Sequence, residues 1–474
     1  MSVLTVNALT GGSVKLSEDA LAGLRGELRG PLCLPGEPGY DTARTIWNAM
    51  IDRRPALIIR AMEAADVTRG VRFASRHGLP VAVRGGGHNI AGKAVCDGGL
   101  MIDLSLMKSV RVDAAARRVH VEPGATLGDL DRETQLAGLA VPVGINSTTG
   151  VAGLTLGGGF GWLQRKYGLT LDNLVSAEVV TAGGESLRAS ATENPDLFWA
   201  IRGGGGNFGV VTSFEFQAHP VGPVLSGLIV HPFANAGELL RGYRQVAAQA
   251  PDELTCWVVM RKAPPLPFLP PEVHGTEVVV LAVCWCGDVA AGEKAIAPLR
   301  ALGKPHAEVI GPNPLAGWQT AFDPLLTPGA RNYWKSHDFR ELSDGLIDEL
   351  VAAVKQLPTP ECEVFIAQLG GAINRVPVGA TAYPHRDVEF VMNVHTRWTD
   401  PSQDKTCIAW ARGLFDRTAP FATGGVYVNF MPEDEDQRVP QGAYGANFER
   451  LAKLKTRFDP TNVFRQNMNI RPGR

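Results

Sequence analysis

The sequence predicts an α+β fold in two domains, the second containing an antiparallel β-sheet backed by helices. At 474 residues the chain is longer than one hydrophobic core usually supports. In the first half, short β-branched runs alternate with segments whose apolar residues recur at helical spacing. From about Leu225 the pattern changes to longer alternating runs separated by helical segments, as expected of antiparallel strands.

Three helices and several short strands are predicted in the first half. Ser17 is followed by Glu18 and Asp19, a cap and acidic first turn that predict a helix over Ser17–Arg29. A helix over Ala65–His77 has apolar residues at helical spacing. The predicted strands are Ile58–Ile59, Val81–Val83, Leu100–Leu104 and Val119–Glu122. Next comes a predicted helix, Thr126–Ala137, whose Leu127, Leu130 and Leu136 should face inward.

The second half contains longer predicted strands. Glu277–Val283 and Val388–Val394 are strand-like, and Asp344–Lys355 is helical. The proline-rich stretch Ala263–Pro271 cannot pair inside a sheet, so we expect an exposed loop. That loop is either at the mouth of a substrate site or a plain connector.

Composition narrows the function classes. Hydrophobic residues at 45% and charged residues at 20% are typical of a globular protein in water. A net charge of −2 gives no electrostatic reason to expect nucleic acid as a partner. Neither a secretory signal nor an apolar run of membrane-spanning length is visible, so we expect a cytoplasmic protein that does not enter membranes. The seven cysteines form no CxxC pair or zinc-like spacing, which predicts reduced thiols and no metal site.

Two glycine-rich segments are the strongest functional signal. Three glycines and a histidine in Arg84–Asn89 follow a predicted strand, where bare N–H groups could hold phosphate oxygens. The segment Gly150–Trp162 is a longer loop of the same kind. Together they predict one large cofactor that carries phosphate.

Two other glycine patterns resemble nucleotide-binding motifs but lack the residues or flanking secondary structure that those motifs require. Gly87–Ala94 nearly matches GxxxxGK[ST], but Ala94 lacks the hydroxyl that holds magnesium and turn and strand follow it. Gly204, Gly206 and Gly209 match GxGxxG, but a helix precedes them and a strand follows, the reverse of the dinucleotide fingerprint. We therefore disfavour a kinase and a nicotinamide-dependent dehydrogenase.

Taken together, these segments resemble the berberine-bridge-enzyme-like oxidases of the vanillyl-alcohol oxidase superfamily, which have a PCMH-type FAD-binding domain. The resemblance extends from about Tyr40 to the C-terminus and is carried by 84–88, 97–105, 150–173, 196–212 and 444–465. It implies an FAD-binding domain over 1–222, with its core at about 50–222, and a substrate domain over 223–424. It also implies a C-terminal segment, 425–474, that returns to the FAD domain.

The resemblance implies that His88 bonds covalently to the flavin. Some relatives carry a second tether, a cysteine, where this chain has Asn146, so we expect only one covalent bond. A single link predicts smaller substrates than the oligosaccharides accepted by doubly linked relatives. Thr149 falls where relatives control oxygen access. The other implied FAD-binding residues are Arg84, Gly85, Gly86, Gly87, Asn89, Gly92, Gly144, Ser147, Thr148, Gly150, Gly153, Leu154, Gly157, Gly158, Gly159, Gly161, Trp162, Asp172, Val211, Asn467 and Asn469.

The implied reaction removes hydride from a carbon that bears a hydroxyl or amine, after which O2 reoxidises the flavin and gives H2O2. A base is required on the substrate side. In the strand-like run Gly425–Phe430, alternation puts Tyr427 and Asn429 on one face, and Tyr427 is the first candidate. Its pKa, ordinarily about 10, would need a neighbouring positive charge to serve at neutral pH. Further candidates for orienting substrate or lowering that pKa are Gln368, Tyr383, His385 and Arg386.

Two alternatives stay open at this point. An FAD dehydrogenase of the same fold would pass electrons to another acceptor, and a non-catalytic flavin-binding protein would keep the fold without turnover. The small-molecule substrate and the oligomeric state are not identified by the sequence.

Overall fold

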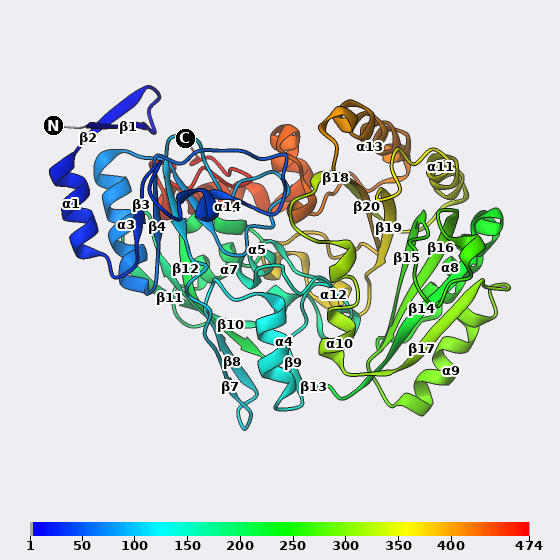
Figure 1. The fold of residues 1–474 in the computed structure, drawn as a ribbon. Helices are drawn as coiled ribbons and strands as arrows, with labels where there is room; N and C mark the ends of the chain where they lie inside the picture. The colour runs from blue at the N-terminus through cyan, green and yellow to red at the C-terminus, as the bar shows by residue number, and fades with distance from the viewer. Residues whose placement is uncertain (1–2, 474) are drawn as a thin grey trace.

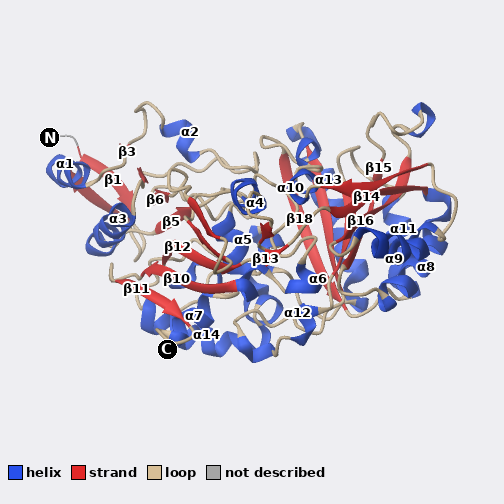
Figure 2. Ribbon diagram, turned by 90° about the horizontal axis from the view of Figure 1, so that it is seen from below, coloured by secondary structure: helices blue, strands red, loops and turns tan. Residues whose placement is uncertain are grey.

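The structure is a computed structural model that describes residues 3–473, and its two lobes confirm the predicted α+β fold. The N-terminal lobe also contains the C-terminal segment, so the blue and red ends of the chain lie in one lobe in Figure 1. The other lobe is a large twisted sheet with helices on its outer face (Figures 1 and 2).

A four-stranded sheet forms one part of the N-terminal lobe, in the order β3-β4-β6-β5. Strands β4, β6 and β5 are parallel, which agrees with the predicted alternation of strands and helices. The bounds are β3 Leu32–Cys33, β4 Leu57–Arg60, β5 Val81–Arg84, β6 Leu100–Asp103 and α3 Ala64–His77. The predicted helix after Ser17 is α1, Glu18–Glu27, and the Ser17 side chain accepts a hydrogen bond from the Ala20 N–H, as a cap should.

A five-stranded antiparallel sheet completes this lobe, in the order β11-β10-β12-β8-β7. The bounds are β7 Val110–Asp113, β8 Arg118–Val121, β10 Leu174–Val180, β11 Ser186–Ser190, β12 Val210–Gln217, α4 Leu127–Gln135 and α7 Pro195–Ile201. Leu127 and Leu130 of α4 are buried as predicted, but Leu136 is 82% exposed. The inward placement of Leu136 was wrong because the helix ends one residue earlier, at Gln135.

Short elements connect these sheets. They are β1 Val3–Asn7, β2 Ser13–Ser17, α2 Tyr40–Arg44, β9 Leu139–Ala140, α5 Val151–Gly157, α6 Gln164–Tyr167 and β13 His219–Pro220. The helix α7 precedes the glycines of the GxGxxG match and strand β12 follows them, so the reversed context was predicted correctly.

The second lobe is a seven-stranded antiparallel sheet in the order β17-β14-β16-β15-β19-β20-β18. Its strands are β14 Val224–Pro232, β15 Leu254–Lys262, β16 Glu277–Trp285, β17 Ala307–Asn313, β18 Arg331–Phe339, β19 Glu363–Gln368 and β20 Phe390–Trp398. Its helices are α8 Ala236–Gln249, α9 Val289–Arg300, α10 Leu315–Gln319, α11 Asp344–Val354, α12 Ala372–Arg375 and α13 Asp404–Thr418. Helices α8, α9 and α11 lie on the outer face of the sheet in both views, which leaves the inner face toward the N-terminal lobe.

The last fifty residues cross back to the N-terminal lobe. Helix α14, Phe448–Phe458, packs against α7, and Val463 and Phe464 enter the core around the parallel sheet. The predicted strand at Gly425–Phe430 was wrong, because Val428–Phe430 is a 3-10 turn. Among residues 3–473, no helix has the length and apolar character needed to span a membrane.

Candidate active site

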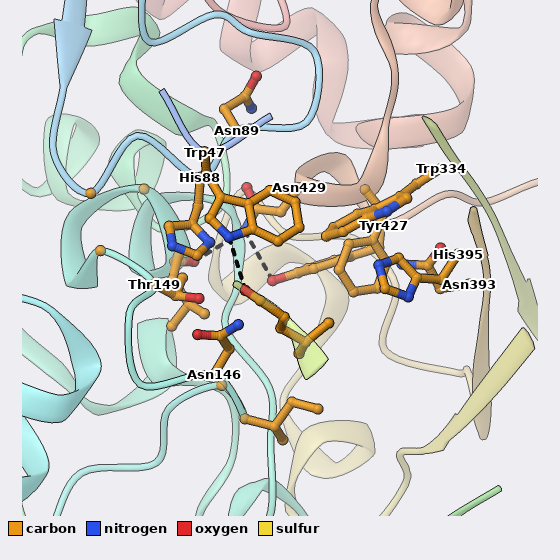
Figure 3. A pocket seen from close by; sticks show the side chains of 18 of the residues that line it. Trp47, His88, Asn89, Asn146, Thr149, Trp334, Asn393, His395, Tyr427 and Asn429 are labelled. Atoms are coloured by element: carbon orange, nitrogen blue, oxygen red, sulfur yellow. Dashed lines mark hydrogen bonds between the residues drawn. The ribbon is translucent and has the colours of Figure 1, made fainter. Parts of the chain in front are cut away.

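A cavity lies between the lobes and is lined by both. From the N-terminal lobe it takes the glycine loop after β5 and the segment 144–154, which runs from a loop into the start of α5, and from the other lobe it takes the inner face of the sheet (Figure 3). The loop at 263–271 also reaches the cavity, through Ala263, Pro264, Leu266 and Leu269. It is therefore more than a plain connector.

Main chain forms the wall of the cavity where the two glycine loops meet. A side chain on Gly86 would collide with the main chain of Gly150, and one on Gly150 would collide with Gly86. Gly87 has a φ of +73°, which favours glycine. Gly85, Gly86, Gly87 and Gly150 all line the cavity, so bare peptide groups face the space where the sequence predicts phosphate.

His88 lies in this wall with its ring held from two sides. Its Nε2 is 3.0 Å from Thr148 Oγ1, and its ring stacks on Trp47 with centroids 5.2 Å apart. Burial lowers the pKa of His88 to about 4, although the contact with Thr148 opposes the shift. The imidazole is therefore neutral at pH 7 and keeps a nitrogen lone pair, which is the form that can act as a nucleophile.

Asn146 occupies the position where some relatives carry a second tether. Its Oδ1 accepts hydrogen bonds from the Thr148 N–H at 3.0 Å and from the Thr148 hydroxyl at 2.7 Å. Asn146 thus positions the residue that contacts His88. None of the described residues that line the cavity is a cysteine, and the seven cysteines are buried and free.

Most of the predicted cofactor residues line the cavity, and the rest lie behind it. Those that line it are Gly85, Gly86, Gly87, His88, Asn89, Gly144, Thr149, Gly150, Gly153, Leu154, Trp162, Val211 and Asn467. Those outside the lining are Arg84, Gly92, Ser147, Thr148, Gly157, Gly158, Gly159, Gly161, Asp172 and Asn469.

The residues outside the lining have other contacts. The Arg84 guanidinium donates to the Ala43 carbonyl at 2.6 Å, and a side chain on Gly92 would press on Ile51. Ser147 hydrogen-bonds to Asp323, and Gly161 donates its N–H to Gln164 at 3.1 Å. Asp172 forms a bidentate ion pair with Arg386, with both N–O distances 2.8 Å. Gly157 and Gly158 pack closely against Asn429 and Tyr427, and Asn469 Oδ1 is buried without a partner.

Tyr427 lines the cavity but lacks the positive neighbour that a base would need. Its hydroxyl oxygen accepts hydrogen bonds from the Gly159 N–H at 2.9 Å and from Asn429 Nδ2 at 3.0 Å. Tyr427 and Asn429, which were predicted to share one face, therefore do lie together. Burial raises the pKa of Tyr427 to about 12 in spite of these bonds. Tyr427 therefore stays protonated and presents a donor.

The other candidates for the substrate side are outside the cavity. Gln368 Oε1 accepts from the Cys256 N–H at 3.0 Å and its Nε2 donates to the Ala247 carbonyl at 3.2 Å, so both ends of the amide hold main chain. His385 lies 3.2 Å from the Ala443 carbonyl and 3.4 Å from Asp338. Tyr383 packs behind Gly158, and burial raises its pKa well above the ordinary value. The structure therefore does not place these side chains in the cavity lining, because each is fixed inside the protein by other contacts.

The sequence reading missed the inner face of the large sheet. Strands β15, β19 and β20 each place alternate residues toward the cavity, and β18 adds one. The signal available in the sequence was a pair of polar residues two apart, Asn393 and His395, that alternate with the apolar Met392 and Val394. The missed residues on these strands are Trp257, Val259, Arg261, Trp334, Glu363, Phe365, Asn393 and His395.

Comparisons with known proteins agree with this architecture. Residues 55–190 match the FAD binding domain family, and residues 426–471 match the family described as berberine and berberine like. An FAD-linked oxidoreductase of Dictyostelium discoideum is 34% identical, over 90% of this chain and 91% of the relative. The (R)-6-hydroxynicotine oxidase of Paenarthrobacter nicotinovorans is 32% identical, over 94% and 97%. The crystal structure of 6-hydroxy-D-nicotine oxidase from Arthrobacter nicotinovorans superposes with a TM-score of 0.84 at 29% identity, over 94% of this chain and 98% of the other.

The fold and the glycine-lined cavity thus define an FAD-dependent oxidoreductase. The cavity suits the cofactor because its wall is bare main chain at Gly86 and Gly150, where a larger residue would not fit. The chain belongs to the berberine-bridge-enzyme-like family of FAD-linked oxidoreductases, as the sequence resemblance predicted.

Proposed function

We propose that the protein is an oxidase that holds FAD through one covalent bond to His88, removes hydride from a carbon bearing a hydroxyl or amine, and passes the electrons to O2 to give H2O2. The observation that carries the proposal is the position of His88 in the wall of a glycine-lined cavity, where Thr148 and Trp47 hold its ring. Its support includes relatives described as oxidases. The substrate would be a small organic molecule.

Residues that line or support the cavity would have separate roles in this reaction. When bound, FAD supplies the acceptor for the hydride. Trp47 and Thr148 fix the ring of His88, so that one nitrogen is held in place for the tether. The Tyr427 hydroxyl accepts two hydrogen bonds and keeps its own hydrogen, so it can donate to an oxygen or nitrogen of the substrate. Phe160 and Phe430 pack around Tyr427 and exclude water from this part of the cavity.

The tether is tested by acid precipitation of the purified yellow protein. We expect the precipitate of the unaltered protein to keep its flavin and that of His88→Ala to release it into the supernatant. His306→Ala is the matched control, because His306 is an exposed histidine that does not line the cavity. Flavin released from the unaltered protein as well would refute the covalent bond.

The oxidase reaction is tested by a peroxide-linked screen of alcohols and amines in air. A substrate that bleaches the flavin and yields H2O2 supports the proposal. Bleaching without peroxide would replace the oxidase with a dehydrogenase, and no bleaching by any compound would favour a flavin-binding protein without turnover.

A further inference from the structure

Buried polar groups without partners gather on the inner face of the large sheet. His395 Nε2, both polar atoms of the Asn393 amide and the Trp334 Nε1 are buried and have no hydrogen-bond partner. All three residues line the cavity (Figure 3), with His395 2% exposed and Asn393 0% exposed. Buried polar groups are rarely left unpaired, because each loses its bonds to water. This cluster therefore indicates where a ligand supplies the missing bonds.

His395 is the end of a chain of charged groups that begins at Arg261. The Arg261 guanidinium donates to Glu363 Oε2 at 2.7 Å, and Glu363 Oε1 is 2.9 Å from His395 Nδ1. The strand register produces this chain, because Arg261 pairs with Glu363 across β15 and β19, and Glu363 pairs with His395 across β19 and β20. Three strands thus present one connected row to the cavity.

The charge of Glu363 fixes the tautomer of His395. Burial raises the pKa of Glu363, but Arg261, the hydrogen bond to His395 and nearby Arg397 together bring it below the ordinary value. Glu363 is therefore a carboxylate and only accepts hydrogen bonds, so His395 Nδ1 must carry the hydrogen. In the neutral form of the ring, this arrangement leaves the lone pair on the other nitrogen, Nε2, which has no partner in the protein.

Aromatic rings line the cavity beside His395. Trp334 meets His395 edge-on with centroids 4.8 Å apart, and Trp257 and Phe365 lie nearly parallel with an interplanar angle of 9°. Phe430 meets both Trp334 and Phe365 edge-on, at 5.6 Å and 5.8 Å. Such walls suit a flat aromatic molecule, and the few polar groups among them would leave most hydroxyls of a saccharide unpaired.

We propose that His395 is the catalytic base for a substrate with a planar aromatic ring whose hydroxyl or amine is on a hydrogen-bearing carbon next to the ring, an inference that rests on the proposed oxidase function. As hydride leaves the substrate carbon for FAD, the proton of the O–H or N–H bond passes to His395 Nε2, and the carbon gains a double bond to that oxygen or nitrogen. The imidazolium so formed is balanced by Glu363. Asn393 binds the same substrate, and Glu363 and Arg261 act as positioning residues.

The test uses 4-nitrophenol, a planar phenol whose phenolate absorbs at longer wavelength than the phenol. The probe is titrated into the flavin-loaded protein at a pH where free 4-nitrophenol is protonated, and the difference spectrum is recorded. We expect the unaltered protein to bind the probe as its phenolate. His395→Asn should bind it with loss of the phenolate band, because an amide cannot accept the proton.

Glu363→Gln is the second variant, and flavin retention checks that each variant is folded. A glutamine can donate to His395 Nδ1, which would move the hydrogen to Nε2 and remove the lone pair. We therefore expect loss of the phenolate band here too, while His306→Asn should keep it, because this exposed histidine does not line the cavity. Should His395→Asn fail to fold, the phenolate band of Glu363→Gln alone tests whether His395 accepts the proton.

Two results would overturn the inference: a phenolate band of equal strength in the unaltered protein and in the folded variants, or no binding of 4-nitrophenol at all. The band does not depend on turnover, so it separates this inference from the oxidase proposal. Peroxide production without the band would remove His395 as the base. The band without peroxide would refute the oxidase alone.

Discussion

The ion pair between Asp172 and Arg386 connects the two lobes and offers a quantitative test of what Asp172 does. The side chains are 10% and 2% exposed, and two parallel hydrogen bonds of 2.8 Å join them. Asp172→Ala would leave the Arg386 charge buried, with the Thr381 hydroxyl among its remaining partners. Removing one partner of a buried pair costs about 3–5 kcal/mol of unfolding free energy.

Denaturant unfolding of the flavin-loaded protein measures this cost. The matched control is Asp387→Ala, which breaks an ion pair with Arg340 whose side chains are 57% and 66% exposed. That exposed pair should contribute only about 0–1 kcal/mol. Asp172 does not line the cavity, so Asp172→Ala should keep its flavin after acid precipitation. Loss of flavin with unchanged stability would refute this reasoning and return Asp172 to the cofactor site.

Two further predictions concern buried titratable groups. Burial raises the pKa of Asp131 to about 7 in the folded protein. The protein is therefore most stable below the ordinary pKa of this carboxyl, loses stability as pH rises from there to about 7, and loses no more above that pH. Asp131→Asn should thus gain up to roughly 4 kcal/mol over the unaltered protein at pH 8 and little at pH 4, and equal gains at both values would contradict the assignment. Tyr427→Phe should keep its flavin and lose stability by about 1–3 kcal/mol, because the Gly159 N–H loses its acceptor. With its pKa near 12, Tyr427 should produce no step in the pH–rate profile between pH 6 and 9, and a step that vanishes in Tyr427→Phe would restore it as the base.

Local chemistry explains what the sequence could predict. Ser17 and Thr126 each cap the helix that follows them, and a cap requires only residues three apart. The glycines before His88 allow a close approach of main chain that a larger residue would prevent. The sequence alone could therefore predict this wall of the cavity. These signals depend on neighbours in the chain, and they predicted the glycine-lined wall of the cavity.

Errors arose where a residue's role depends on which elements pack beside it. Gln368 occupies a predicted sheet run and has a polar side chain, yet both ends of its amide bind main chain from other elements. Tyr427 and Asn429 were predicted to share a face by strand alternation, whereas a 3-10 turn brings them together through a hydrogen bond. Spacing alone cannot distinguish these arrangements, since residues two apart can meet in either.

The inner face of the large sheet shows how much a strand pattern can still reveal. In β20, Met392 and Val394 pack into the core beneath the outer helices, while Asn393 and His395 alternate with them and face the cavity. Alternate residues of a strand point to opposite faces. The apolar set therefore identifies the face covered by helices, and the polar set that alternates with it must belong to the other face. Both faces of β20 are buried, and a buried face with polar residues requires partners. The strand register gives His395 Nδ1 a partner, Glu363, and leaves His395 Nε2 without one. A free ring nitrogen at the cavity is the property expected of a base that accepts a proton from a bound substrate.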